Sequence, residues 1–166
     1  MAIDKIHPAH AINRYLWSRI EAEGILDKKN YSGLIPIIPV EESPEFITIV
    51  ESQPGITSYP YIVYSWNRAS LGQTWFLKSH NIAYSIRSND DDKTDQLLNL
   101  FEKEFQGYDT AAINVNEWIT LNGSNLHKKY NFLYINIQTL GAPMPSGSEN
   151  GVSEALITIS VNYTEN

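Results

Sequence analysis

The chain has 166 residues, of which 42% are hydrophobic and 19% charged, and it contains no cysteine. This length fits one domain, and the apolar content allows a folded core, so disordered and fibrous classes are excluded. The formal net charge of −7 argues against phosphate-backbone binding, which depends on Lys and Arg displacing counterions. Without cysteine there are no disulfides, cysteine nucleophiles or thiolate metal sites. No apolar run is long enough to cross a bilayer and no signal peptide stands at the start, so we expect a soluble protein made inside the cell.

The first periodic segment covers residues 8–23. It places Ile12, Leu16 and Ile20 four residues apart, which predicts a helix with one apolar stripe. Proline at its start and Gly24 after its end suit a first turn and a C-terminal cap.

An irregular stretch follows. Residues 34–40 are apolar but contain Pro36 and Pro39, each of which removes a backbone donor and restricts its neighbour, so we expect an extended edge or arm. The β-branched run 46–50 predicts a short strand, and residues 53–55 have the composition of a turn.

A hairpin is predicted next. Residues 61–66 form an almost wholly apolar run typical of a buried strand, residues 68–72 a turn, and residues 74–87 a long alternating strand. One face of the long strand carries Phe76, Lys78, His80, Ile82, Tyr84 and Ile86.

A second helix is predicted after the hairpin, ending at Gly107. Its apolar stripe is preceded by acids that suit the positive end of a helix dipole. These acids are Asp90, Asp91, Asp92 and Asp95. Residues 88–110 hold seven acids and two bases, so −5 of the net −7 lies here.

The C-terminal part is predicted to be mainly β. Residues 111–121 indicate a weaker strand or strand pair, and 122–125 a turn. Residues 132–140 and 155–163 alternate as strands do. Between them, residues 141–154 form a long connection rich in Gly, Pro and Ser, and such loops are usually functional or disordered.

This order of elements predicts an α+β fold. We expect a single domain over residues 1–166, with a mainly antiparallel or mixed sheet and two helices packed on one face.

Motifs of catalysis are missing from the sequence. No serine lies in a Gly-x-Ser-x-Gly elbow and no glycine-rich phosphate loop follows a strand, so we expect no enzyme activity and no cofactor. A small hydrolase with residues distant in sequence is the alternative. The aspartates lack the pattern of a calcium loop, and His7 and His10, three residues apart, lack zincin spacing, so we expect no metal site.

Aromatic residues concentrate around the hairpin, at Tyr59, Tyr61, Tyr64, Trp66 and Trp75. Such side chains stack on sugars or anchor interfaces, and equally they fill ordinary cores. A β-rich carbohydrate-binding module is therefore an alternative function.

Two regions are candidate interfaces. Arg68 and Leu71 stand at the predicted hairpin tip, either as a contact site or as a solvated turn. The proline-bearing segments have apolar residues without a regular period, and they cover either a neighbouring subunit or the domain's own sheet edge. Their candidate residues are Pro36, Pro39, Pro143, Met144 and Pro145.

The order of elements resembles that of tail terminator and neck (head–tail joining) proteins of tailed bacteriophages. The resemblance lies in the helix 8–23, the strand Tyr-Pro-Tyr-Ile-Val-Tyr at 59–64, the long strand 74–87 followed directly by Asn-Asp-Asp-Asp-Lys-Thr-Asp and a helix, and the closing strand 156–163. The arm at 34–40 and the loop at 141–154 depart from it.

The resemblance implies a virion structural protein. It would form a homo-oligomeric ring, a hexamer, at the head-proximal end of the tail, end tail tube polymerisation and dock to the head connector or other neck proteins. DNA would pass through without specific binding, and assembly would take place in the host cytoplasm. Asp90 to Asp95 would face the lumen or outer solvent. A head completion protein of the neck is the alternative within this group.

Overall fold

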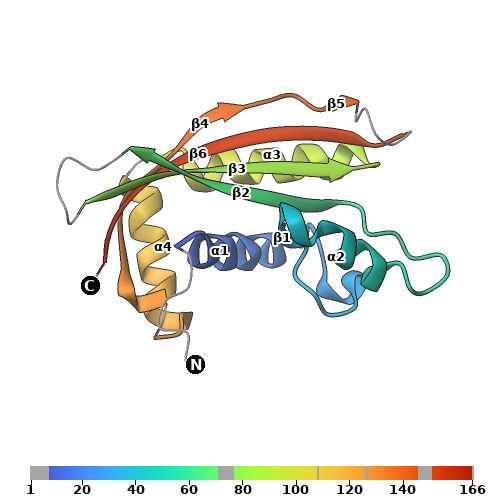
Figure 1. Cartoon of the computed structure of the whole chain (residues 1–166), viewed down its shortest axis with the longest axis horizontal. Coiled ribbons are helices and arrows are strands. Elements are labelled where there is room, and N and C mark those ends of the chain that lie inside the picture. Colours follow the sequence, from blue (N-terminus) through green and yellow to red (C-terminus); the bar gives the residue numbers. More distant parts are fainter. Residues whose placement is uncertain (1–7, 71–76, 108, 126, 146–150, 166) are drawn as a thin grey trace.

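A mixed β-sheet organises the chain (Figure 1). The computed structural model describes residues 8–70, 77–107, 109–125, 127–145 and 151–165. Five strands lie in the order β1-β2-β3-β6-β4, and the short β5 pairs with β6 beside the end of β4. The strands are β1 (Ile37–Pro39), β2 (Tyr61–Ser70), β3 (Lys78–Ser88), β4 (Tyr130–Leu140), β5 (Met144–Pro145) and β6 (Ser153–Glu165). Only the β1–β2 pair is parallel among these described strands.

The hairpin prediction is confirmed, because β2 and β3 pair antiparallel from Tyr61↔Arg87 to Ser70↔Ser79. The predicted face of β3 is also the buried one, with His80, Ile82 and Tyr84 among its inward residues. Strand β2 continues to Ser70, so residues 68–70 of the expected turn belong to the strand, and residues 71 and 72 lie outside the described residues.

The two C-terminal strands are confirmed as well, with one correction in β4. Strict alternation places Phe132 and Ile135 on opposite faces, yet both are buried. The register shifts between Phe132 and Tyr134, where an extra residue in β4 reverses the alternation.

The described residues form four helices beside the sheet, where two were expected. They are α1 (Pro8–Ala22), α2 (Ser43–Val50), α3 (Asp91–Phe105) and α4 (Asp109–Asn122). Short 3-10 turns occupy Lys28–Tyr31 (η1), Val40–Glu42 (η2) and His127–Lys129 (η3). Helices α1 and α3 are the two predicted ones. In the described part of the chain, no helix is both long and apolar enough to cross a bilayer.

The strand expected at 46–50 is wrong, because these residues belong to α2. Pro44 lies in the first turn of the helix, where its missing N–H costs nothing. Phe46 and Val50, one turn apart, are buried, and the Phe46 ring contacts those of Tyr31 and Tyr61. Tertiary packing overrides the β propensity of this run.

The strand or strand pair expected at 111–121 is also wrong, because these residues form α4. Ala111, Val115 and Ile119 are buried at intervals of four, which is the spacing of one helix face. The β-branched content of the segment concealed this spacing.

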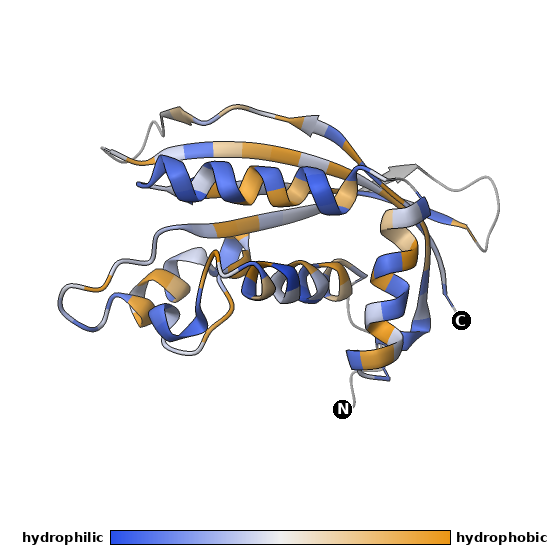
Figure 2. Ribbon diagram, turned by 180° about the vertical axis from the view of Figure 1, so that it is seen from behind, coloured by the Kyte–Doolittle hydropathy of each residue, from blue (hydrophilic) through white to orange (hydrophobic). Residues whose placement is uncertain are grey.

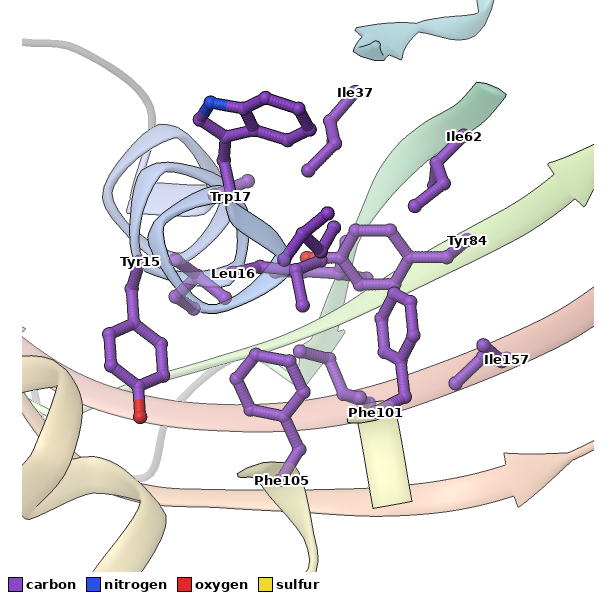
Figure 3. Close-up of a cluster of buried hydrophobic side chains, with 14 of the residues drawn as sticks. Tyr15, Leu16, Trp17, Ile37, Ile62, Tyr84, Phe101, Phe105 and Ile157 are labelled. Carbon is purple, nitrogen blue, oxygen red and sulfur yellow. The ribbon is translucent and has the colours of Figure 1, made fainter. Parts of the chain in front are cut away.

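The core lies between α1, α3 and one face of the sheet. Figure 3 shows Leu16 of α1 and Phe101 and Phe105 of α3 meeting Tyr84 and Ile157 of the sheet. All five side chains are inaccessible to solvent or nearly so. The Tyr84 hydroxyl donates to Asn13 Oδ1 of α1 at 2.7 Å, so the buried polar atom of this cluster is satisfied.

Candidate interaction surfaces

A groove of about 630 Å³ lies between α1, residues 33–39 and α2. Its existence depends on the edge strand: the N–H of Ile62 donates to the Pro36 carbonyl at 2.8 Å, which holds β1 against β2. Ile37 and Phe46 line the groove, and Leu34 and Ile49 are exposed at it. The arm predicted at 34–40 is therefore both an edge strand and one wall of this groove.

The groove carries charges of opposite sign. Arg14 and Lys28 come from α1 and η1, whereas Glu42 and Glu45 come from η2 and α2. Arg14 is exposed and makes no ion pair with any described residue. Among the described residues, the Arg14 guanidinium therefore has no ion-pair partner and lies in the groove beside apolar side chains.

A pair of imidazoles fastens the start of α1 to the segment after α4. The backbone N–H of Ser124 donates to His127 Nδ1 at 3.1 Å, so the proton of neutral His127 lies on Nε2. That Nε2 donates to His10 Nδ1 at 2.8 Å. Burial, reinforced by the positive charge of Arg14, lowers the pKa of both histidines. This environment therefore favours the neutral form of both imidazoles.

Among the described residues, no three His, Cys, Asp or Glu side chains gather as metal ligands would. His7 lies outside the described residues.

A buried carboxylate joins α1 to α3. Glu104 is 8% exposed and accepts from the Tyr15 hydroxyl at 2.6 Å and from Arg19 Nε at 3.0 Å. Burial and the bond to this carboxylate raise the pKa of Tyr15. Glu23 bonds Arg19 and Lys103 at the exposed end of the network. Since both oxygens of Glu104 are already bonded within the chain, we assign the carboxylate a structural role.

The residues predicted at the hairpin tip are only partly described. Arg68 lies in β2 opposite His80, in the strand and not in a turn. Leu71 lies outside the described residues.

The proline-bearing candidates occupy the two sheet margins. Pro36 is buried and Pro39 is partly buried beside β2. In the connection 141–154, Met144 and Pro145 form β5 opposite Glu154 and Ser153. Pro143 is partly buried and Met144 is 67% exposed.

The predicted helix-start role of the aspartates is confirmed. Asp90 accepts hydrogen bonds from the N–H groups of Asp92 and Lys93, which makes it the N-cap of α3. Asp91, Asp92 and Asp95 are exposed on the surface of the single chain.

The hairpin aromatics pack against one another. Tyr61 is buried against Tyr59, and Tyr64 contacts the buried Tyr84. The centroids of the Trp66 and His80 rings lie 4.2 Å apart. These contacts favour core packing over a sugar-stacking row; Trp75 lies outside the described residues.

The outer side of α4 is a surface that the sequence prediction missed. Ile113 and Leu121 are 52% and 82% exposed, and the exposed Glu117 lies midway between them. Hydrophobic residues recur along α4 to its C-terminal end (Figure 2). A helix reading would have revealed this stripe, because the three residues are spaced four apart.

The sheet face away from α1 and α3 is a second exposed surface. Over β3 and β6 it carries partly exposed polar residues, including Ser79 and Asn162, whose side chains bond at 2.7 Å. Leu156 is exposed on the same face.

No protein-family model matches this chain, and no curated protein sequence matches it either. The surfaces of the chain itself are therefore the basis for assigning a function.

Proposed function

We propose that the chain is a virion structural protein that forms a ring at the head-proximal end of a phage tail. In this role it ends tail tube polymerisation and docks to the head connector. One observation carries the proposal: exposed apolar residues lie on two different surfaces. Leu34 and Ile49 border the groove near α2, whereas Ile113 and Leu121 project from α4. Helices α2 and α4 lie at opposite ends of the molecule (Figure 1).

Two unlike surfaces favour a ring over a two-fold dimer. A two-fold contact uses the same patch on both subunits, whereas a head-to-tail contact joins two different patches and closes when the rotation permits. A hexamer is the ring size implied by the resemblance to tail terminator proteins. A closed ring has no free patch left, which suits a protein that stops a polymer.

The acidic start of α3 is compatible with a channel for DNA. Asp91, Asp92 and Asp95 are exposed, and α3 contains fewer basic residues than acidic ones. A lumen or outer rim lined by carboxylates repels phosphates, so DNA passes without being held. A ring structure with these aspartates buried between subunits would contradict this placement.

The direct test measures mass in solution by sedimentation, first for the protein alone and then with purified tail tubes. We expect assembly into a closed ring and, by electron microscopy, density at one end of each tube. A protein that stays monomeric in both experiments would overturn the proposal. Binding to head connectors without tube capping would instead assign the chain to the head completion role.

A further inference from the structure

Helix α4 carries two large aliphatic side chains that its own chain does not cover. Its inner side buries Ala111, Val115 and Ile119, while Ile113 and Leu121 remain in solvent on the outer side. At 1.5 Å of rise per residue the two exposed side chains stand about 12 Å apart along the helix. Two exposed aliphatic side chains on the same side of a helix are candidates for burial in an assembly.

The groove between α1 and α2 has the properties that such a helix requires. It lies between two helices, is lined by apolar residues such as Ile37 and Phe46, and is bordered by the exposed Leu34 and Ile49. An amphipathic helix binds a groove of this kind through apolar anchors on one of its faces.

Each of the two surfaces offers a charged side chain that can pair with one on the other surface. Glu117, between the two apolar residues of α4, makes no ion pair with any described residue. Arg14 and Lys28 of the groove are likewise without an ion-pair partner in the described part of the chain. Glu42 and Glu45 on the α2 wall repel a docked carboxylate and direct it towards Arg14 and Lys28.

We propose that the outer face of α4 (Ile113, Glu117 and Leu121) docks in the α1–α2 groove of the neighbouring copy. Glu117 then faces Arg14 and Lys28. The occupant is a second copy of this chain because both complementary halves belong to it. The contact is heterologous, and the inference rests on the proposed ring.

The test is a charge-reversal cycle measured by sedimentation at pH 8, where both histidines beside Arg14 are neutral. Glu117→Arg and Arg14→Glu are each expected to weaken self-association about tenfold, because like charges meet in the contact. The double variant is expected to recover to within about threefold of the unmodified protein, since the pair is restored with reversed sign. Both positions are exposed, so thermal unfolding should stay unchanged.

Two further variants sharpen the test. Leu121→Ser removes an apolar anchor and is expected to weaken association without altering thermal unfolding. Glu102→Arg reverses an exposed glutamate on α3, outside the proposed contact, and is expected to leave association unchanged.

The outcomes separate the two proposals. Rings that form and cap tubes equally well in every variant would overturn the docking inference and leave the ring function standing. Single reversals that weaken association without recovery in the double variant would overturn the Glu117–Arg14 pairing. An unmodified chain that stays monomeric with tubes present would overturn the ring function itself.

Discussion

Helices α3 and α4 are neighbours in the chain, but they distribute their apolar residues differently. In α3, Leu97, Phe101 and Phe105 point into the core, while the outward positions hold Asp95 and Glu102. In α4, the buried residues are Ala111, Ala112, Val115 and Ile119, whereas the aliphatic side chains of Ile113 and Leu121 face solvent. The apolar residues of α3 are buried within one chain, whereas α4 leaves Ile113 and Leu121 exposed, and we propose that a second copy buries them. We therefore expect stability and the proposed assembly to respond to different mutations.

The largest contrast is expected between Phe101→Ala and Leu121→Ala. Phe101 is fully buried against Tyr84 and Phe105, so its truncation leaves a cavity and should lower the free energy of unfolding by about 4 kcal/mol. Leu121→Ala should change that free energy by less than about 0.5 kcal/mol and still weaken assembly. Urea unfolding and sedimentation measure the two effects; a strongly destabilised Leu121→Ala would show that α4 is not an outer helix.

Glu104→Gln tests the tie between α3 and α1. The amide keeps one acceptor, but the charge that balances Arg19 is lost from a buried position, so we expect a loss of about 2 kcal/mol. Glu23→Gln, at the exposed end of the same network, is the matched control and should cost less than about 0.5 kcal/mol. Equal effects in urea titrations would contradict the structural role of Glu104.

Asn116→Ala tests the tie between α4 and the sheet. The Asn116 amide donates to the Phe132 carbonyl at 2.7 Å and accepts from the Phe132 N–H at 2.9 Å. Its loss should cost about 1.5 kcal/mol, because both backbone groups lose a partner in a partly buried place. Asn114→Ala on the exposed side should be close to neutral, and hydrogen exchange at the Phe132 amide should quicken only in the first variant.

We predict that protonation of the imidazole pair lowers the free energy of unfolding by about 1 kcal/mol, the scale of one hydrogen bond. Since the folded pKa of His10 and His127 is lowered, their contribution is complete above the unfolded value near 6.5 and is lost as pH falls. Arg14 acts on both histidines through space, and Lys128 and Lys129 of η3 follow His127 directly in the chain. All three are cations.

The measurement compares urea unfolding at pH 7.5 and pH 5. We expect His10→Gln to lose less stability between these two pH values than the unmodified chain does. An identical or larger loss in the variant would remove the pair as the source of the acid sensitivity.

Local patterns were sufficient to predict α1, α3 and the β2–β3 hairpin. Each of these elements has a clear period and end signals: Gly24 follows α1, and Asp90 caps α3. The edge position of residues 34–40 also followed from their prolines. Helices α2 and α4 were missed because their β-branched residues favour strands locally, and only contacts with distant residues reverse that preference.

The candidate surfaces were less predictable than the fold. The groove joins Arg14 of α1 to Phe46 of α2, more than thirty residues further along, and His10 bonds a residue 117 positions further along the chain. The periodicity of a local segment does not predict contacts between residues so far apart in the sequence. The outer stripe of α4 could have been found from the spacing of Ile113, Glu117 and Leu121, had the segment been considered as a helix.

The clamp of Asn116 on Phe132 has a consequence for how copies can meet. Strand β4 forms one margin of the sheet, and an unprotected margin invites further strands and runaway fibre growth. By occupying both backbone groups of one β4 residue, a single carboxamide imitates the missing neighbour and blocks strand addition at that point. Growth by repeated strand addition is thereby disfavoured at this point, which leaves side-chain surfaces for the closed assembly that we propose.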